Sequence, residues 1–446
     1  MGAWRDPCPL ILCKECAKED NMTLLVKNGR VINPATEFDD KADILVEDGI
    51  IKKVGKGIRN KADQVIDAKG CYVFPGFIDL HVHLRDPGFT EKETVETGMA
   101  AAAAGGYTTV FAMPNTKPVV DNRDVVSYVH HKAEAVDTIT VKQIGAITIG
   151  QNGEKLADLE GMVEAGAPGF SEDGKSVMNS RVYYEAMIKA KELDVPIFAH
   201  CEDKNLVGEG AVHEGIASKK LGVPGILSTV ENSIMARDMM LATDVGCRLH
   251  LCHCSTKECY NAVKNAQAYG LPISGEVTPH HFTLVDEDIV KPDTNFKMNP
   301  PVRTKEDREA LRKGISEGVF VIATDHAPHT KLDKNASMKE APFGIVGLET
   351  AAALTHDVLV GQKYLEPMGM ARALSYGPAK IAGLATGDIS EGKVADITIF
   401  DPEKSWKIDG DKFVGKSHNQ PYNGRSVKGR VKYTIAKGKL VYEDDK

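Results

Sequence analysis

Short apolar runs alternate with amphipathic stretches along the middle of the chain. The run at 319–323 is apolar at every position, which is typical of a strand buried on both faces of a parallel sheet. The stretches between the runs predict helices, among them helices near 155–165 and over 180–193, 231–243 and 256–268. The apolar runs predict eight strands, at 77–83, 107–112, 144–149, 169–171, 196–200, 248–253, 273–277 and 319–324.

Two capping patterns indicate where helices of this alternation begin. Thr90 with Glu93 forms a capping-box pattern before the alanine run 100–104, and Thr304 with Asp307 caps a helix that leads to the last strand. Eight alternating strand–helix units predict an α/β fold, a (β/α)8 TIM-like barrel over residues 75–387.

The two ends of the chain have a different pattern, with β-rich segments separated by turn dipeptides. Asn28-Gly29, Asp48-Gly49 and Lys437-Gly438 predict turns. We expect residues 22–74 and 388–446 to build one small β domain together. Residues 1–21 have no regular pattern and are expected to be a mobile N-terminal extension, because their single CxxC pair (Cys13, Cys16) lacks the further ligands of a closed zinc site.

Composition narrows the class of protein. Hydrophobic residues make up 42% and charged residues 26% of the chain, as in ordinary globular proteins. The net charge of −8 argues against nucleic acid or an anionic membrane as the main partner, and no apolar run is long enough to span a bilayer. The nine cysteines are an odd number in a long chain, which favours reduced thiols and a cytoplasmic location.

Several predicted strands are followed directly by polar residues. His81-Val-His83 closes the first strand, and residues two apart in a strand point to the same side. His200, His253 and Asp325 close three further strands. Since the C-terminal ends of barrel strands meet at one face, these side chains predict a site for zinc or a similar divalent metal.

Asp173 adds a carboxylate that could bridge two cations. Its neighbour Glu172 would point the other way in an extended segment. A two-metal site needs about six protein ligands. The sequence offers His81, His83, Asp173, His200, His253 and Asp325.

Five motifs together resemble those of the dihydroorotases, which belong to the amidohydrolase superfamily. The two strongest are Asp79-Leu-His-Val-His-Leu-Arg-Asp-Pro-Gly88 and Ala323-Thr-Asp-His-Ala-Pro-His329. The others are Met113-Pro-Asn-Thr-Lys-Pro118, Glu276-Val-Thr-Pro-His-His281 and Lys297-Met-Asn-Pro-Pro-Val-Arg303. The resemblance extends from about Asn28 to Leu440 and is closest to the class I bacterial type. Asp86 and Glu172 depart from the usual residues but keep their charge.

The resemblance implies reversible hydrolysis of dihydroorotate to N-carbamoyl-L-aspartate in pyrimidine biosynthesis, by a hydroxide that bridges two Zn²⁺ ions per chain. It implies His81, His83 and Asp325 on one ion, His200 and His253 on the other, and Asp173 between them. Asp325 resembles the family's catalytic acid and base. The implied substrate contacts are Arg85, Asn115, Asn299, His329, Phe343 and Gly344, with 328–346 as a substrate-facing loop.

Other acidic and imidazole side chains are expected to play supporting roles. We expect Asp79 to accept hydrogen bonds from the neighbouring imidazoles, and His280 and His281 to pack beside the ligands. His250 is expected in the core, and His326 is expected to be structural.

Two alternatives remain at the level of sequence. Hydantoinases and allantoinases bridge their metals with a carboxylated lysine after a Gly-Phe pair, whereas Ser171 follows Gly169-Phe170 here. Lys175 is a further candidate for that role, although we expect it on an exposed turn. A non-catalytic relative would lack metal ligands, and none of the six is missing. We expect a homo-oligomer, and relatives imply possible association with aspartate transcarbamoylase.

Overall fold

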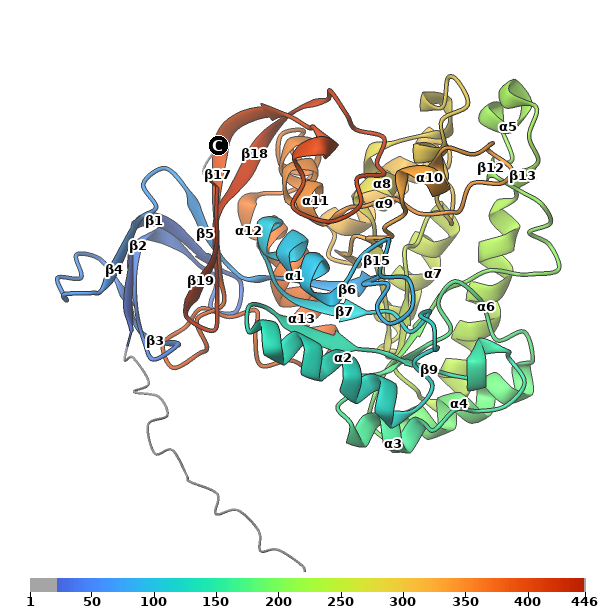
Figure 1. Cartoon of the computed structure of the whole chain (residues 1–446), viewed down its shortest axis with the longest axis horizontal. Helices are drawn as coiled ribbons and strands as arrows, with labels where there is room; N and C mark the ends of the chain where they lie inside the picture. Colours follow the sequence, from blue (N-terminus) through green and yellow to red (C-terminus); the bar gives the residue numbers. More distant parts are fainter. Residues whose placement is uncertain (1–21, 445–446) are drawn as a thin grey trace, which may run out of the picture.

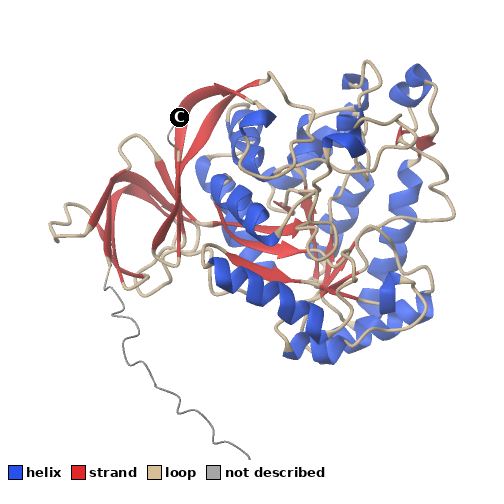
Figure 2. Ribbon diagram, viewed as in Figure 1, coloured by secondary structure: helices blue, strands red, loops and turns tan. Residues whose placement is uncertain are grey.

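The computed structural model describes residues 22–444, so the predicted extension 1–21 and its CxxC pair lie outside the described residues. The middle of the chain forms a parallel barrel surrounded by helices (Figures 1 and 2). Two parallel sheets, ordered β6-β7-β8 and β9-β10-β11-β14-β15-β16, make up its wall. Their strands are β6 (Phe77–Val82), β7 (Tyr107–Ala112), β8 (Thr140–Gln143), β9 (Gly145–Ala146), β10 (Phe170–Ser171), β11 (Ile197–Ala199), β14 (Leu249–Leu251), β15 (Ile273–Val277) and β16 (Phe320–Ile322).

The two sheets join at both of their edges, which closes the barrel. The Ile144 amide donates to the carbonyl of Ala112 (3.0 Å), and the His83 amide donates to that of His326 (2.8 Å). Since β8 and β9 form one strand interrupted at Ile144, the wall has the eight strands of the predicted (β/α)8 barrel. The fold prediction is therefore confirmed.

The third strand lies earlier than predicted. The pattern placed it at 144–149, whereas β8 and β9 cover Thr140–Gln143 and Gly145–Ala146, and Ile149–Gln151 forms a 3₁₀ turn. Ile147 and Thr148, which follow β9, are buried, and their amides donate to the buried carboxylate of Glu172. A buried loop thus produced the apolar signal that predicted a strand.

The helices mostly begin where the pattern indicated. Thr304 caps α9 (Lys305–Ser316) in a capping box with Asp307, as predicted. The Thr90–Glu93 prediction is wrong, because Thr94 caps α1 (Val95–Ala104) with Thr97. The remaining α-helices are α2 (Arg123–Val136), α3 (Leu159–Glu164), α4 (Ser180–Glu192), α5 (Ile216–Leu221), α6 (Ser228–Val245), α7 (Lys257–Ala268), α8 (Pro279–Thr283), α10 (Lys331–Lys334), α11 (Leu348–Leu354), α12 (Pro367–Ala371) and α13 (Gly377–Ile381).

Strands from both ends of the chain form one further sheet, as the sequence predicted. Its order is β19-β18-β17-β5-β1-β2-β3, with β4 also paired to β1, and β17 from the C-terminal part runs antiparallel to β5. The strands are β1 (Thr23–Asn33), β2 (Phe38–Glu47), β3 (Ile50–Gly55), β4 (Gln64–Asp67), β5 (Tyr72–Pro75), β17 (Ile397–Lys407), β18 (Ser426–Ala436) and β19 (Lys439–Glu443). The domain limits at 74/75 and 387/388 stay a prediction.

Two of the three predicted turns join strands of this sheet. Asp48-Gly49 connects β2 to β3 and Lys437-Gly438 connects β18 to β19, with positive φ at all four residues. Asn28-Gly29 instead lies inside β1, where the register with β2 shifts between Val26 and Gly29. That dipeptide therefore makes a bulge and not a hairpin. The short strands β12 (Val212–His213) and β13 (Gly225–Ile226) pair with each other, apart from the other three sheets.

Candidate active site

The six predicted metal ligands come from five strand ends of the barrel. His81 lies in β6 and His83 directly follows it, while Asp173 comes two residues after β10. His200 directly follows β11, His253 comes two residues after β14, and Asp325 comes three residues after β16. All six are buried. The structure therefore brings the whole predicted set to the C-terminal face of the barrel, where barrel active sites lie.

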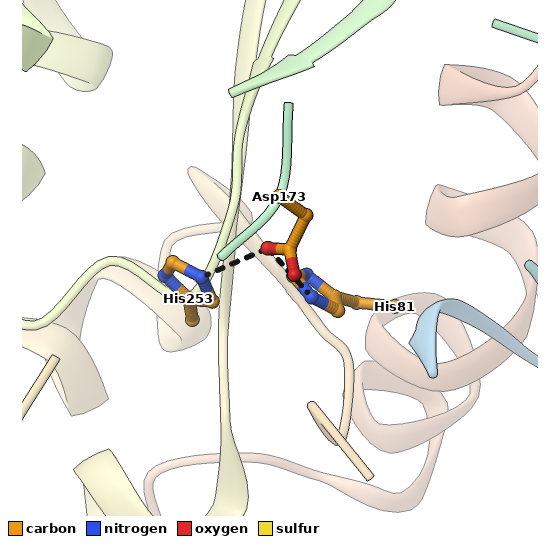
Figure 3. A group of neighbouring side chains, drawn as sticks. All are labelled: His81, Asp173 and His253. Atoms are coloured by element: carbon orange, nitrogen blue, oxygen red, sulfur yellow. Dashed lines mark ion pairs between the residues drawn. The ribbon is translucent and has the colours of Figure 1, made fainter. Parts of the chain in front are cut away.

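The carboxylate of Asp173 lies at the centre of this cluster. Its Oδ1 is 3.2 Å from His81 Nε2 and 3.7 Å from His253 Nε2 (Figure 3). The same oxygen is 3.5 Å from His200 Nδ1. Its Oδ2 is 3.5 Å from His83 Nε2. One carboxylate thus faces all four imidazoles, with its two oxygens directed toward different histidines.

Asp325 closes the other side of the cluster. Its Oδ1 lies 3.1 Å from His83 Nε2 and 3.6 Å from His81 Nε2. Within the described chain, three groups of ligand atoms lie close enough together to hold a metal ion. They are His81 with Asp173 and His253, His81 with His83 and Asp325, and His81 with Cys252 and Glu276.

The cluster has the features of a cation site. His81 Nε2 and Asp173 Oδ1 are buried and have no hydrogen-bond partner among the described residues. Burial opposes charge on Asp173, yet the neighbouring histidines His81 and His200 hold its pKa well below the usual range. In the same way, burial lowers the pKa of His200, but the neighbouring carboxylates of Asp173 and Glu202 raise it to about 10. Imidazole and carboxylate ligands together suit zinc and similar divalent ions.

Glu276 contacts the predicted ligand His81 at the ring nitrogen that faces away from Asp173. Its Oε1 accepts from His81 Nδ1 (3.0 Å), and its Oε2 accepts from His250 Nε2 (2.9 Å). Burial raises the pKa of Glu276, but these hydrogen bonds lower it to about 2, so it stays ionised. In the sequence, Glu276 stood out only as part of a motif. The role of accepting hydrogen bonds from the imidazoles was predicted for Asp79 instead.

Asp79 accepts hydrogen bonds from main-chain amides and not from imidazoles, so its expected role is wrong. Its carboxylate accepts from the amides of His81 (3.0 Å) and Thr324 (3.1 Å). These bonds join the ends of β6 and β16. Asp79 therefore positions the two strand ends that carry the predicted ligands His81 and Asp325.

Amide side chains complete the surroundings of two further imidazoles. Asn115 Oδ1 accepts from His83 Nδ1 (2.8 Å), which directs His83 Nε2 toward the carboxylates. Asn299 Nδ2 donates to Glu202 (3.1 Å), whose same oxygen accepts from His200 Nε2 (3.0 Å). The predicted substrate residues Asn115 and Asn299 thus lie at the cluster. Glu202 was missed, although it stands only two residues after a predicted ligand.

Arg85 lies beside the cluster and contacts the loop 328–346, which carries His329. Arg85 Nε donates to the Pro328 carbonyl (3.2 Å), and its Nη2 is 3.3 Å from His329 Nε2. That nitrogen donates to the carbonyl of Phe343 (2.8 Å). Burial lowers the pKa of Arg85 to about 10 and, with the positive charge of Arg85, lowers the pKa of His329 to about 2. Arg85 is therefore a half-buried cation beside a neutral imidazole.

The remaining predicted contacts lie on the same loop. Gly344 has a φ of +126° and its amide donates to the carbonyl of Lys297 (2.9 Å). Asn419, from the segment between β17 and β18, donates to the carbonyls of Ala327 (3.2 Å) and Gly344 (3.0 Å). A residue of the C-terminal part of the chain thus holds both ends of the loop, and no sequence motif pointed to it.

The two neighbours of Asp173 point away from the cluster. Glu172 accepts from the amides of Ile147 and Thr148, as expected for a side chain directed the other way. Lys175 is half-buried and not on a fully exposed turn, and its Nζ donates to the carbonyl of Gln151 (2.9 Å).

Comparison with known proteins is consistent with this geometry. A family model described as Dihydro-orotase-like matches residues 70–259. The dihydroorotase of Clostridioides difficile strain 630 is 45% identical over 421 residues, covering 94% of this chain and 99% of that protein. The dihydroorotase of Bacillus subtilis strain 168 is 46% identical over 426 residues, covering 95% and 99%. The chain belongs to the dihydroorotase family.

Solved structures of other cyclic amidases share the fold of this dihydroorotase family member. The L-hydantoinase of Arthrobacter aurescens superimposes with a TM-score of 0.85 at 24% identity, covering 95% of this chain and 97% of that one. The D-hydantoinase of a Thermus species gives a TM-score of 0.81 at 28% identity, covering 95% and 96%. No helix within residues 22–444 combines the length and the apolar character required to cross a bilayer.

Proposed function

We propose that this chain catalyses the reversible hydrolysis of dihydroorotate to N-carbamoyl-L-aspartate. The observation that carries the proposal is the placement of Asp173 Oδ1 within 3.7 Å of three imidazoles, beside the half-buried cation Arg85. The substrate is a cyclic imide with a carboxylate. The cluster of predicted metal ligands matches the imide, and the half-buried cation beside it matches the carboxylate.

We propose that two zinc ions bind at this cluster. His81, His83 and Asp325 would hold one ion, His200 and His253 the other, and Asp173 would bridge them with its two oxygens. Bound there, the ions would activate water and polarise the substrate carbonyl at neutral pH. Glu276, Asn115 and Glu202 support this assignment, because each accepts from the outer nitrogen of a proposed histidine ligand.

Asp325 is the proposed proton carrier. Although burial opposes its charge, the hydrogen bond from His83 and the charge of His81 hold the pKa of Asp325 below its usual range, so it begins the reaction as a base. In the direction of hydrolysis it would take a proton from the attacking water. It would then return that proton to the ring nitrogen as the bond to the carbonyl carbon breaks.

Arg85 is the proposed partner of the substrate carboxylate. Its guanidinium presents two parallel N–H groups, and bidentate pairing of this kind fixes the direction of a carboxylate. Asn115, Asn299 and His329 would contribute further polar contacts. Phe343 and Gly344 would border the ring with their main chain.

Turnover by the purified full-length chain tests the proposal, with zinc measured on the same sample. Opening the ring creates one more carboxylate, so closure takes up one proton. The equilibrium should shift about tenfold toward dihydroorotate for each unit fall in pH. Hydantoin, which lacks the carboxylate, serves as the control substrate. Faster turnover of hydantoin than of dihydroorotate, or an equilibrium that does not move with pH, would contradict the proposal.

We also propose a cytoplasmic location, a homo-oligomeric state and possible association with aspartate transcarbamoylase. Support for the location comes from the six described cysteines, which are all free and buried, as in a reducing compartment. Light scattering of the purified chain, alone and mixed with the transcarbamoylase, tests both assembly proposals.

A further inference from the structure

Lys334 is a buried lysine whose side chain reaches only carbonyl oxygens. It ends α10 in the loop 328–346 and is 8% exposed. Its Nζ donates to the carbonyls of Thr294 (3.0 Å), Lys297 (3.3 Å) and Pro342 (2.9 Å). An ammonium group has three hydrogens, so these three acceptors use all of them. None of the proposed catalytic or substrate-binding roles involves this side chain.

A second lysine connects the same two segments, residues 294–299 and the loop 328–346, in the opposite direction. Lys297 Nζ donates to the carbonyl of Lys339 (3.0 Å) in the loop and lies 4.5 Å above the centre of the Phe343 ring. The Gly344 amide donates to the carbonyl of Lys297, and the Thr294 hydroxyl donates to that of Lys334. Each segment thus contributes a lysine that ends on the main chain of the other.

These contacts join the two parts of the chain that carry proposed substrate contacts. The loop carries His329, Phe343 and Gly344, and the segment 294–299 ends at Asn299. We propose that Lys334 is a positioning residue, which fixes the substrate loop against the segment that carries Asn299. This inference rests on the proposed function, because it concerns the binding of dihydroorotate.

The surroundings of Lys334 are rich in positive charge, which makes its burial informative. Lys297 and Arg85 face it as cations, Asp293 and Asp333 as anions, and His329 lies nearby as a neutral imidazole. Burial, together with the charges of Lys297 and Arg85, lowers the pKa of Lys334 to about 7. Burial and the nearby cations disfavour the charged form of Lys334. The contacts to the three carbonyls and the carboxylates of Asp293 and Asp333 are therefore what stabilise the ammonium group at this position.

Lys334→Met tests the inference, because it keeps most of the side-chain volume and removes every donor. Lys331→Met is the matched control, since Lys331 lies on the same short helix with its side chain 83% exposed and paired with Asp411. We expect Lys334→Met to raise the KM for dihydroorotate about tenfold or more, with kcat changed less than threefold and zinc content unchanged. Lys331→Met should change neither constant.

Hydrogen exchange tests the positioning without the substrate and therefore without the proposed function. In Lys334→Met, the amides of 328–346 should exchange at least tenfold faster, while those of α9 and β16 keep their rates. Unchanged loop exchange with KM within twofold of wild type would overturn the inference. So would faster exchange throughout the barrel, which would make Lys334 a general stabilising residue. If Lys334→Met does not fold, Lys297→Met removes the reciprocal contact and must release the loop in the same way.

Discussion

Some side chains at the strand ends are proposed to take part in the reaction, and others hold neighbouring side chains in position. Asp325 combines both, because it lies 3.1 Å from His83 and is the proposed proton carrier. Asp325→Asn keeps the shape and removes the base. We expect kcat to fall about 10²–10⁴-fold, as for loss of a general base. Steady-state kinetics with zinc measured on the same sample checks this, and a kcat within tenfold of wild type at full zinc content would assign the proton transfer elsewhere.

The substrate carboxylate gives a second test at the residue scale. Arg85→Ala removes the guanidinium and should lower kcat/KM for dihydroorotate at least about thirtyfold, mainly through KM, because a buried charge loses its partner. Arg85→Lys retains a positive charge but lacks the planar guanidinium. Its kcat/KM for dihydroorotate should therefore lie between those of wild type and Arg85→Ala. If Arg85→Ala leaves KM unchanged, the carboxylate binds at another side chain.

Residues show most clearly what the sequence could and could not predict. The grouping of the six proposed ligands at one face of the barrel was predictable, because polar side chains at the ends of buried strands have no role in the core. Glu276 and Glu202 were not, since each acts through an imidazole that reaches it only after folding. Asp79 was assigned to imidazoles but binds main-chain amides, because a sequence does not show which donors approach a buried carboxylate.

At the scale of helices and strands, buried residues in loops caused errors in the predicted element boundaries. The third strand was misplaced because Ile147 and Thr148 are buried beneath Glu172 in a loop. The start of α1 was misplaced because Glu93 belongs to a different set of contacts, with Lys416 and near His326. Strands were predictable where apolar runs were continuous, as in β16. The role of Asn419 in holding the substrate loop depends on a contact between the C-terminal part of the chain and the barrel.

The turn after β10 carries the prediction that belongs to this scale. Asp173 points into the cluster, whereas Lys175 points out and donates to Gln151. Asp173→Ala should lose at least one zinc ion and reduce turnover at least about a thousandfold, because one carboxylate serves both proposed metals. Lys175→Ala is the matched control and should keep metal content and activity near wild type. The reverse pattern would transfer the bridge to a carboxylated lysine.

For the whole molecule, the fold collects ligands from distant parts of the chain, and protons compete with the metal for them. Without an ion, the carboxylates Asp173 and Glu202 raise the pKa of His200 to about 10 against the effect of burial, and Asp173 also raises that of His81. We therefore expect both histidines to carry a proton at pH 7 in the metal-free protein. Zinc binds neutral imidazole, so binding must release these protons.

The competition between protons and zinc determines whether zinc affinity rises or falls with pH. Below the raised pKa values, each proton released should increase zinc affinity about tenfold per unit rise in pH. Calorimetric titration of the metal-free protein with zinc, in buffers of different ionisation enthalpy, measures the number of protons released. We expect at least one proton per chain near pH 7, and fewer in Asp173→Ala because the carboxylate that raises both pKa values is gone. Zinc uptake without proton release would show that the ions bind outside this cluster.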